Sequence, residues 1–469
     1  MVEAGSTPEG RVTSGDRPTM GGTASPDKGG SPDEGALTDE RALADVRPRN
    51  TGAPGIARHG RLRKRRALPF VLSIIGSLAA VAVVSSVSLS AYALWNVTSS
   101  VKPAVKLVDA KGNVIPPIPE VGAISGGFNV LLAGSDSGGG NKAYGSRGEV
   151  LNDVTMLLHV SADHKNATVV SFPRDMFVPI PSCPTEDGKG SYSAMSRQKI
   201  NNTLSYGGLA CTVLTVEKLT GLTIPYAGVI EFDGVIEMSN AVGGVPVCAG
   251  GDISDDMTGL NIKAGQNTLQ GAQALAFLRT RHGVGDGSDL GRISNQQVFL
   301  SSLVRTIKSS DTLTNPVKVY GLARAAVKNI KLSESLSNLT TIVSIAAALR
   351  NIDLNKVVFV QYPNHYVKGG GGVEPTEDAA ETLMTALAAD KPIALTGDTG
   401  VGSETAPDSP ATQPPATQPP ATQPPATQPP ATQPPATQPP ATQAQSVELP
   451  SDVHGQTAGQ VTCSKPFTG

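Results

Sequence analysis

The sequence predicts a layered α/β domain, in which helices cover a mixed central sheet, and a single membrane-spanning helix near the N-terminus. Short β-branched runs alternate with amphipathic runs through the middle of the chain. An uncharged apolar segment precedes them, and segments rich in glycine, proline and polar residues lie at both ends. The 469 residues include 51 glycines, 37 prolines and only 4% aromatic residues. Because a chain of this composition has few large apolar side chains to bury in a core, we expect the folded part to be shorter than the whole chain.

Residues 1–66 are predicted to be a disordered cytoplasmic segment ending in a basic run. Residues 67–95 are predicted to form the transmembrane helix, because they are uncharged and exceed the roughly 20 residues that span a bilayer. A cleaved signal peptide is the alternative, although the run is long and begins late for one. Lysine and arginine lie before the helix and not directly after it, which predicts a cytoplasmic N-terminus and an extracytoplasmic remainder.

Residues 96–125 contain several prolines and are predicted to be an extracytoplasmic stalk, followed by a globular domain at 126–390. Short apolar runs predict strands at 129–133, 155–160, 168–172, 227–230 and 356–361. Helical spacing predicts helices at 209–219, 232–241, 271–279, 293–307 and 333–349. The runs at 150–160 and 167–178 predict a hairpin, so the sheet should be mixed rather than fully parallel.

Residues 391–469 are predicted to be a disordered tail. Within it, residues 411–443 repeat Ala-Thr-Gln with Pro-Pro between copies, which is typical of an extended spacer without a core. The end of this tail is polar but contains Cys463.

The four cysteines, Cys183, Cys211, Cys248 and Cys463, all follow the apolar segment. An even number in an oxidising compartment favours two disulfides, for which three pairings are possible. We favour Cys183–Cys211, because both residues flank one loop-to-helix region. This choice leaves Cys248–Cys463, which would hold the tail against the domain. Free buried thiols are the alternative.

Composition and motifs exclude several classes of protein. The net charge of −2 argues against a nucleic-acid partner. The basic run adjoins the apolar helix, where anionic lipid headgroups are the expected contact. The chain lacks phosphate-binding P-loop, zinc-protease, nucleophile-elbow and C-x-x-C motifs.

Two aspartates lie beside neighbouring predicted strands. Asp136 ends the first strand run and Asp153 begins the next. Carboxylates at such strand ends are where α/β ligand sites form, and a pair can hold a hard cation such as Mg²⁺. Taken singly, each aspartate could equally cap a turn.

Arginines supply the second part of a candidate site. Arg174 precedes Asp175 after the third strand, and is either a phosphate ligand or that residue's ion-pair partner. Arg279 and Arg281 share a face if their segment is extended and diverge if it is helical. Helical spacing places Arg292 and Gln296 on one face and lets Asp289 cap that helix.

Other residues nearby have a functional and a structural interpretation. The loop at 283–287 contains three glycines, so its backbone can approach a ligand closely. Lys199 is a candidate substrate ligand or a solvated charge, and Asn202 a candidate ligand or a helix cap. The arginines themselves could form a structural salt-bridge network.

The predicted site combines aspartates, which suit a metal ion, with arginines, which suit phosphate. This combination favours chemistry on a pyrophosphate ester. Outside the membrane, a lipid-linked pyrophosphate is the natural candidate.

Seven ordered motifs make residues 126–308 resemble the LytR-CpsA-Psr family of bacterial cell-wall proteins. They are Leu131-Leu-Ala-Gly-Ser-Asp136, Asn152-Asp-Val-Thr-Met-Leu-Leu-His159, Ser171-Phe-Pro-Arg-Asp175, Lys199-Ile-Asn-Asn202 with Tyr206-Gly-Gly208, Val242-Gly-Gly-Val245, Leu275-Ala-Phe-Leu-Arg-Thr-Arg281, and Asp289-Leu-Gly-Arg292 with Gln296. Asn152 and Val154 depart from the usual surroundings of Asp153. Neither departure removes a charged residue.

The resemblance implies an α/β/α sandwich with a hydrophobic tunnel, on a single-pass membrane protein whose catalytic domain is extracytoplasmic. It implies a phosphotransferase that moves a glycopolymer from a polyprenyl-pyrophosphate carrier onto peptidoglycan and forms a phosphodiester. A hydrolase of the lipid pyrophosphate and a non-catalytic wall-binding or regulatory module are the alternatives.

The resemblance also implies roles for individual residues. Asp136 and Asp153 would hold Mg²⁺ or Mn²⁺. The pyrophosphate would be clamped by Arg174, Arg279 and Arg281, with Arg292 and Gln296 beside them. Asp175 or Asp289 would take the acceptor's proton. Further substrate contacts would come from Arg147, Lys199 and Asn202.

Overall fold

In this computed structural model, the residues described are 67–99, 102–109, 112–114, 126–136, 150–309, 315–406 and 445–468. The predicted disordered segment 1–66 lies outside them. Helix α1 (Ala67–Ser99) covers the predicted membrane segment. Its stretch Val71–Leu89 has 19 residues with a mean hydropathy of 2.1. By length and composition, this helix can cross a membrane.

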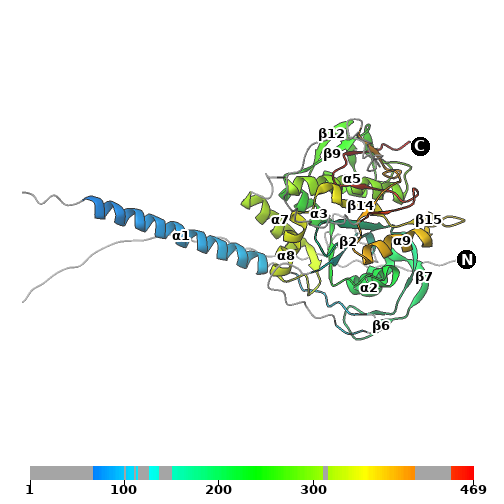
Figure 1. Cartoon of the computed structure of the whole chain (residues 1–469), viewed down its shortest axis with the longest axis horizontal. Coiled ribbons are helices and arrows are strands. Elements are labelled where there is room, and N and C mark those ends of the chain that lie inside the picture. The colour runs from blue at the N-terminus through cyan, green and yellow to red at the C-terminus, as the bar shows by residue number, and fades with distance from the viewer. Residues whose placement is uncertain are drawn as a thin grey trace, which may run out of the picture. The chain divides into compact units, whose positions relative to one another are not determined.

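The domain is built around a mixed seven-stranded sheet, as predicted (Figure 1). Its order is β13 (Ile330–Leu332), β8 (Tyr226–Ile230), β1 (Phe128–Ser135), β2 (Asn152–Val160), β3 (Ala167–Phe172), β14 (Val357–Gln361) and β20 (Gly455–Thr457). β1 pairs with β8 and β3 with β14 in parallel, and the other neighbours are antiparallel.

The predicted hairpin is β2–β3. Its strands pair from Thr155↔Phe172 to Val160↔Ala167. The turn is stabilised by the carboxylate of Asp163, which accepts hydrogen bonds from the Ser161 hydroxyl at 2.7 Å and the Lys165 N–H at 3.0 Å. Asp side chains stabilise turns in this way.

Helices lie on both sides of the sheet: α2 (Thr203–Thr220), α3 (Phe232–Ala241), α4 (Ala272–Arg279), α5 (Asp289–Lys308), α7 (Pro316–Asn329), α8 (Leu339–Arg350) and α9 (Glu377–Ala388). Alternate strand residues face opposite layers. Val170 of β3 belongs to the core formed with α2 and α9, whereas Val169 packs with residues of α5 and α8. The result is an α/β/α sandwich (Figure 1).

One predicted helix differs from the structure, and two helices have no counterpart among the predictions. The helix predicted at 333–349 begins only at Leu339, because the Ser333 hydroxyl accepts the Ala227 N–H of β8 and Asn338 caps the helix by accepting the Thr340 N–H. Helices α7 and α9 were not among the predicted helices.

A second sheet joins distant segments. Its order is β12 (Gly265–Leu269), β9 (Val245–Ala249), β21 (Thr462–Ser464) and β18 (Ser403–Thr405). Pairs of short strands complete the fold: β4 (Phe177–Ile180) with β7 (Met195–Lys199), β5 (Cys183–Pro184) with β6 (Ser191–Tyr192), β10 (Ile253–Asp255) with β11 (Leu260–Ile262), β15 (Asn364–Tyr366) with β16 (Val373–Pro375), and β17 (Ile393–Ala394) with β19 (Val447–Glu448).

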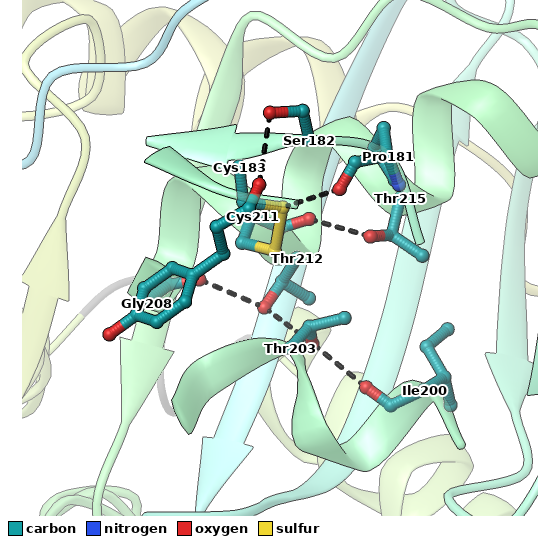
Figure 2. Close-up of a disulfide and its surroundings, with 10 residues drawn as sticks. Pro181, Ser182, Cys183, Ile200, Thr203, Gly208, Cys211, Thr212 and Thr215 are labelled. Carbon is teal, nitrogen blue, oxygen red and sulfur yellow. Dashed lines mark hydrogen bonds between the residues drawn. A yellow bond between two sulfur atoms is a disulfide. The ribbon is translucent and has the colours of Figure 1, made fainter. Parts of the chain in front are cut away.

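Both favoured disulfides are present. Cys183–Cys211 joins β5 to α2 and is fully buried (Figure 2). Around it, the hydroxyls of Thr203 and Thr212 lie 2.9 Å apart and Thr215 donates to the Cys211 carbonyl at 2.8 Å (Figure 2). Cys248–Cys463 joins β9 to β21 across a sequence separation of 215.

The prediction of a disordered tail from residue 391 is wrong for the described residues 391–406 and 445–468. β20 pairs with β14 in the central sheet, and β21 pairs with β9 and β18. The guanidinium of Arg305 donates to the carbonyls of Ala458 and Gln460 at 2.7 and 3.1 Å, and burial lowers its pKa. These strands are too short to show a period, so only their distant partners define them. The repeats at 411–443 lie outside the described residues.

The stalk prediction for 96–125 is wrong for part of that segment. Helix α1 continues to Ser99. The N–H of Val105 donates to the Leu332 carbonyl at 2.9 Å, and Leu107 is only 3% exposed within the core. Residues 102–109 therefore belong to the folded domain.

Candidate active site

The two predicted metal-binding aspartates lie at one edge of the central sheet. Asp153 occupies a bulge in β2, because Gly134 pairs with Val154 but Ser135 pairs with Asn152. Asp136 follows β1 and is 4% exposed, and its carboxylate accepts the Leu151 N–H at 3.0 Å. The bulge turns Asp153 out of the regular strand alternation.

Arg174 connects three carboxylates at this edge. Its guanidinium forms an ion pair with Asp153, and its Nε lies 3.6 Å from Asp175. Its backbone N–H donates to Asp289 at the start of α5, at 3.3 Å. The structure shows the ion-pair interpretation of Arg174, with Asp153 as a partner besides Asp175, and its role as a phosphate ligand stays a prediction.

Arg292 holds α5 against this edge. One of its guanidinium nitrogens lies 2.6 Å from Asp289 and donates to the Asp153 carbonyl at 2.9 Å, and its side chain is 5% exposed. The expectation that Asp289 caps the helix is wrong. Ser288 is the N-cap and accepts the Gly291 N–H, which leaves the Asp289 carboxylate for Arg292.

Arg281 lies among these charges. Burial, and then the neighbouring charges of Arg292 and Arg174, lower its pKa, against the opposing effects of Asp289 and Asp153. The position of its backbone depends on Asp255, which the sequence did not suggest. The buried Asp255 carboxylate accepts the Thr280 hydroxyl at 2.5 Å and the Arg281 N–H at 3.2 Å. Burial raises the pKa of Asp255, but hydrogen bonds from Thr280, Met257 and Arg281 outweigh it, so the pKa is lowered overall.

Arg279 faces a different environment from Arg281. It is the last residue of α4, and Thr280 has an extended conformation that ends the helix between them. The Arg279 guanidinium lies 4.4 Å from the centre of the Phe232 ring. No signal in the sequence pointed to Phe232 as part of the site.

A largely apolar cavity of about 210 Å³ adjoins the cluster. Strands β1 and β2 and helices α3, α4 and α5 supply its apolar lining, which includes Leu132, Met156, Val235, Leu278 and Phe299. Of its four charged lining residues, Asp153, Arg279 and Arg292 are shared with the arginine cluster, whereas Glu231 forms an ion pair with Lys102 at 2.8 Å. Apolar walls with a few convergent polar groups are typical of ligand sites.

The remaining predicted ligands fall in different places. Lys199 pairs with Asp175 at 2.9 Å. Gln296 lines the cavity while its amide donates to the Leu278 carbonyl at 2.9 Å. Asn202 lies in the 3₁₀ turn Ile200–Asn202, and its side chain makes no capping hydrogen bond to the helix that follows. Arg147 lies outside the described residues.

The glycine-containing loop at 283–287 is occupied by the chain itself. The Gly285 N–H donates to the Lys465 carbonyl at 2.9 Å, and Phe467 donates to the Gly283 carbonyl at 3.0 Å. Gly285 has a φ of +58°, and a Cβ there would lie 2.7 Å from the Val401 carbonyl oxygen. The close approach serves the C-terminal segment, not the ligand that the sequence suggested.

The cluster carries excess positive charge. Among these residues, four arginines (174, 279, 281 and 292) outnumber three aspartates (136, 153 and 289), and Lys199 offsets Asp175, so formal charges sum to +1. A partly buried cationic site beside an apolar cavity suits a ligand that has an anionic head and an apolar chain.

Comparison with known proteins identifies the relationship. A model of the LytR_cpsA_psr family matches residues 98–389. The chain belongs to the LytR-CpsA-Psr family. Probable cell wall biosynthesis protein LcpB of Corynebacterium glutamicum is 30% identical over 352 residues, which are 73% of this chain and 77% of LcpB.

Other relatives align over different lengths. Cell wall biosynthesis protein LcpA of the same organism is 31% identical over 57% of this chain, and the chain spans only 55% of LcpA. Polyisoprenyl-teichoic acid–peptidoglycan teichoic acid transferase TagT of Bacillus subtilis is 27% identical over 63% of this chain and 88% of TagT. A solved LytR-Csp2A-Psr enzyme from Actinomyces oris is 20% identical, with a TM-score of 0.46 over 61% of this chain and 96% of that one.

The predicted divalent cation can be tested against the donor set. Mg²⁺ is commonly bound by one or two carboxylates together with substrate phosphates. Asp136 and Asp153 supply hard oxygen donors at one sheet edge, and Asp153 already faces the cationic Arg174. These residues fit such an ion. Within the described ranges, no three His, Cys, Asp or Glu side chains gather as a metal cage.

Proposed function

We propose that this chain is a membrane-anchored phosphotransferase that moves a glycopolymer from a polyprenyl-pyrophosphate carrier onto peptidoglycan. The observation that carries the proposal is the arginine cluster at the charged end of an apolar cavity. This combination matches a lipid-linked pyrophosphate, whose chain is apolar and whose head is anionic. TagT is named for a transfer of this kind, and the Corynebacterium relatives are named for cell wall biosynthesis.

We place the N-terminus in the cytoplasm and the domain outside the membrane. Six basic residues lie at positions 58–66 before α1, whereas only Lys102 and Lys106 lie in the ten residues after it. Both disulfides lie in the domain, and disulfides persist in oxidising compartments. In this orientation the cavity and the carrier lipid are on the same side of the membrane.

The chemistry assigns separate tasks to the residues. Arg174, Arg279, Arg281 and Arg292 bind and neutralise the pyrophosphate, and the apolar cavity takes the adjoining part of the lipid. Asp136 and Asp153 would hold Mg²⁺, which when bound withdraws charge from phosphoryl oxygens. An acceptor hydroxyl forms a bond to the sugar-linked phosphorus while the pyrophosphate bridge breaks. Polyprenyl phosphate leaves, and the hydroxyl proton passes to a carboxylate.

Of Asp175 and Asp289, we assign Asp175 as the carboxylate that takes the proton from the acceptor hydroxyl. The Asp289 carboxylate is 13% exposed, is ion-paired with Arg292 and accepts the Arg174 N–H. The Asp175 side chain is 26% exposed, and Lys199 is its nearest cation. The carboxylate that takes this proton must lie within hydrogen-bonding reach of the acceptor hydroxyl.

The test uses the full-length protein in detergent micelles with a polyprenyl-pyrophosphate oligosaccharide, peptidoglycan fragments and Mg²⁺. Mass spectrometry should detect the phosphodiester product, and EDTA should abolish it. Arg281→Ala should lose the product, whereas Arg350→Ala, at an exposed arginine of α8, should keep it.

The alternatives give different products. Free oligosaccharide and polyprenyl phosphate, formed equally with and without peptidoglycan, would identify a hydrolase. Carrier binding without turnover across a panel of glycans would indicate a binding or regulatory protein and would refute the transferase.

A further inference from the structure

Arg279 is held differently from its neighbours in the arginine cluster. Arg174 and Arg292 each form an ion pair with an aspartate. Across the described ranges, no carboxylate forms an ion pair with Arg279, and its guanidinium instead lies 4.4 Å from the centre of the Phe232 ring. The contact that fixes the Arg279 side chain is therefore aromatic.

An aromatic contact leaves Arg279 able to bind an anion. A ring attracts a guanidinium through its quadrupole and brings no negative charge of its own. A carboxylate partner would instead neutralise the charge and occupy N–H donors. Arg279 thus keeps its positive charge and its planar set of donors, which match the oxygens of a phosphate.

The Phe232 ring belongs to a tightly packed part of the fold. Phe232 is the first residue of α3 and is 8% exposed. The preceding Glu231 forms an ion pair with Lys102 at 2.8 Å, and its carbonyl accepts the Gly234 N–H at 2.9 Å. A Cβ at Gly234 would lie 3.1 Å from the Asn329 Cβ, so glycine lets α3 begin close against α7. This packing fixes the start of α3, and with it the ring, before any ligand binds.

The contact between Phe232 and Arg279 lies where apolar and charged surfaces meet. Both side chains line the apolar cavity. Arg292 is the other cluster arginine in this lining, and it is paired with Asp289. A lipid-linked pyrophosphate has a matching boundary at the bond between its apolar chain and its first phosphate. When the chain lies in the cavity, Arg279 is placed to meet that phosphate.

We propose that Phe232 is a positioning residue whose ring holds the Arg279 guanidinium at the phosphate nearest the lipid chain. The inference rests on the proposed transferase function, because that function supplies the lipid-linked pyrophosphate. A guanidinium that is already oriented loses less conformational freedom when the phosphate binds, so the affinity for the carrier rises. Phe232 makes no hydrogen bond to the phosphate and acts through Arg279.

Binding is measured by calorimetric titration of the full-length protein in detergent micelles with farnesyl monophosphate and with farnesyl pyrophosphate. Phe232→Leu keeps an apolar side chain but removes the ring, and it should raise both Kd values about fivefold. Phe232→Tyr keeps the ring and should bind within about twofold of the parent. In an Arg279→Met background, Phe232→Leu should raise neither Kd further, because its effect passes through the guanidinium.

Phe299→Leu is the matched control. Phe299 lines the same cavity and is 3% exposed, and in the described part of the chain no guanidinium lies over its ring. Any loss of binding in this variant comes from apolar packing. The loss should therefore be the same in the parent and in the Arg279→Met background.

Equal losses from Phe232→Leu in the two backgrounds would overturn the inference, as would parent-like binding in Phe232→Leu or no measurable binding by the parent. A loss confined to farnesyl pyrophosphate would overturn the assignment of Arg279 to the phosphate nearest the lipid. The expected losses in a protein that forms no phosphodiester product would refute the proposed function alone. The thermal midpoint of each variant detects misfolding, and Phe232→Met provides a second substitution without a ring.

Discussion

Replacing Arg281 by alanine should separate activity from stability. Arg281 lies among two arginines and two aspartates, and both burial and like charges lower its pKa. A lowered pKa means that the fold disfavours the charged form. The residue is therefore retained at a cost to stability, which a binding or catalytic role would explain.

The expected loss of activity follows from the role assigned to the guanidinium. Removing one preorganised donor from a site of developing negative charge typically lowers the rate 10²–10³-fold, or about 2.7–4 kcal/mol. The formal charge of the cluster falls from +1 to 0. Arg281→Lys keeps the charge but loses the planar fork, so it should restore anion binding better than it restores transfer.

The thermal midpoint of the alanine variant should equal or exceed that of the parent, because the burial of a charged guanidinium and its repulsion with Arg292 and Arg174 are relieved, which outweighs the lost attraction to Asp289 and Asp153. Differential scanning fluorimetry with and without inorganic pyrophosphate, at constant ionic strength, measures both effects. At a ligand concentration of 100 times the Kd, the parent gains about 2.7 kcal/mol, and a tenfold weaker site gains about 1.4 kcal/mol. The reasoning fails if pyrophosphate stabilises the variant as strongly as the parent, or if the variant unfolds well below it.

Four further predictions follow from the same structure. Replacing Cys248 and Cys463 by alanine removes a link across 215 residues, whose stabilisation the loop-entropy model puts at about 5 kcal/mol. The same model gives about 3.6 kcal/mol for the Cys183–Cys211 link across 28 residues. The thermal midpoint should therefore fall further in the variant without Cys248 and Cys463 than in the variant without Cys183 and Cys211. Burial is the main cause that raises the pKa of Glu217, and the nearby charge of Asp109 adds to it, although a hydrogen bond from the Ile224 N–H acts in the opposite direction. The ionised carboxylate therefore destabilises the fold above this raised pKa. Glu217→Gln should raise the thermal midpoint at pH 7, and this gain should vanish below about pH 4.5, where the carboxyl group is protonated in both states. Val235→Trp should fill the cavity and weaken carrier binding while pyrophosphate stabilisation persists. Truncation after residue 406 removes β19, β20 and β21 and should abolish cooperative unfolding.

Each of these has a result that would contradict it. Equal midpoints for the two cysteine double variants would contradict the loop-length argument. A Glu217→Gln gain that persists at low pH would mean that ionisation is not its cause. Unchanged carrier binding in Val235→Trp would remove the cavity from the site, and a cooperative transition in the truncated chain would show that the C-terminal strands are dispensable.

Local sequence alone determined the membrane helix, the β2–β3 hairpin and most of the helices. Each of these depends on neighbouring residues: an uncharged apolar stretch, an Asp-stabilised turn, or apolar residues at helical spacing. The sequence likewise singled out the aspartates and arginines of the cluster. It placed Asp289 and Arg292 one helical turn apart, and they form an ion pair.

The tertiary structure alone decided which of these residues meet. Arg279 ends α4 and lies beside the Phe232 ring, whereas Arg281 follows the extended Thr280 and depends on a distant carboxylate, Asp255. The C-terminal strands joined both sheets although their sequence suggested a disordered tail. Strands of three residues contribute little stability by themselves, and their hydrogen bonds and burial come from segments far away in the chain. Local pattern therefore cannot reveal them, whereas pairing with β14 and β9 fixes them in place.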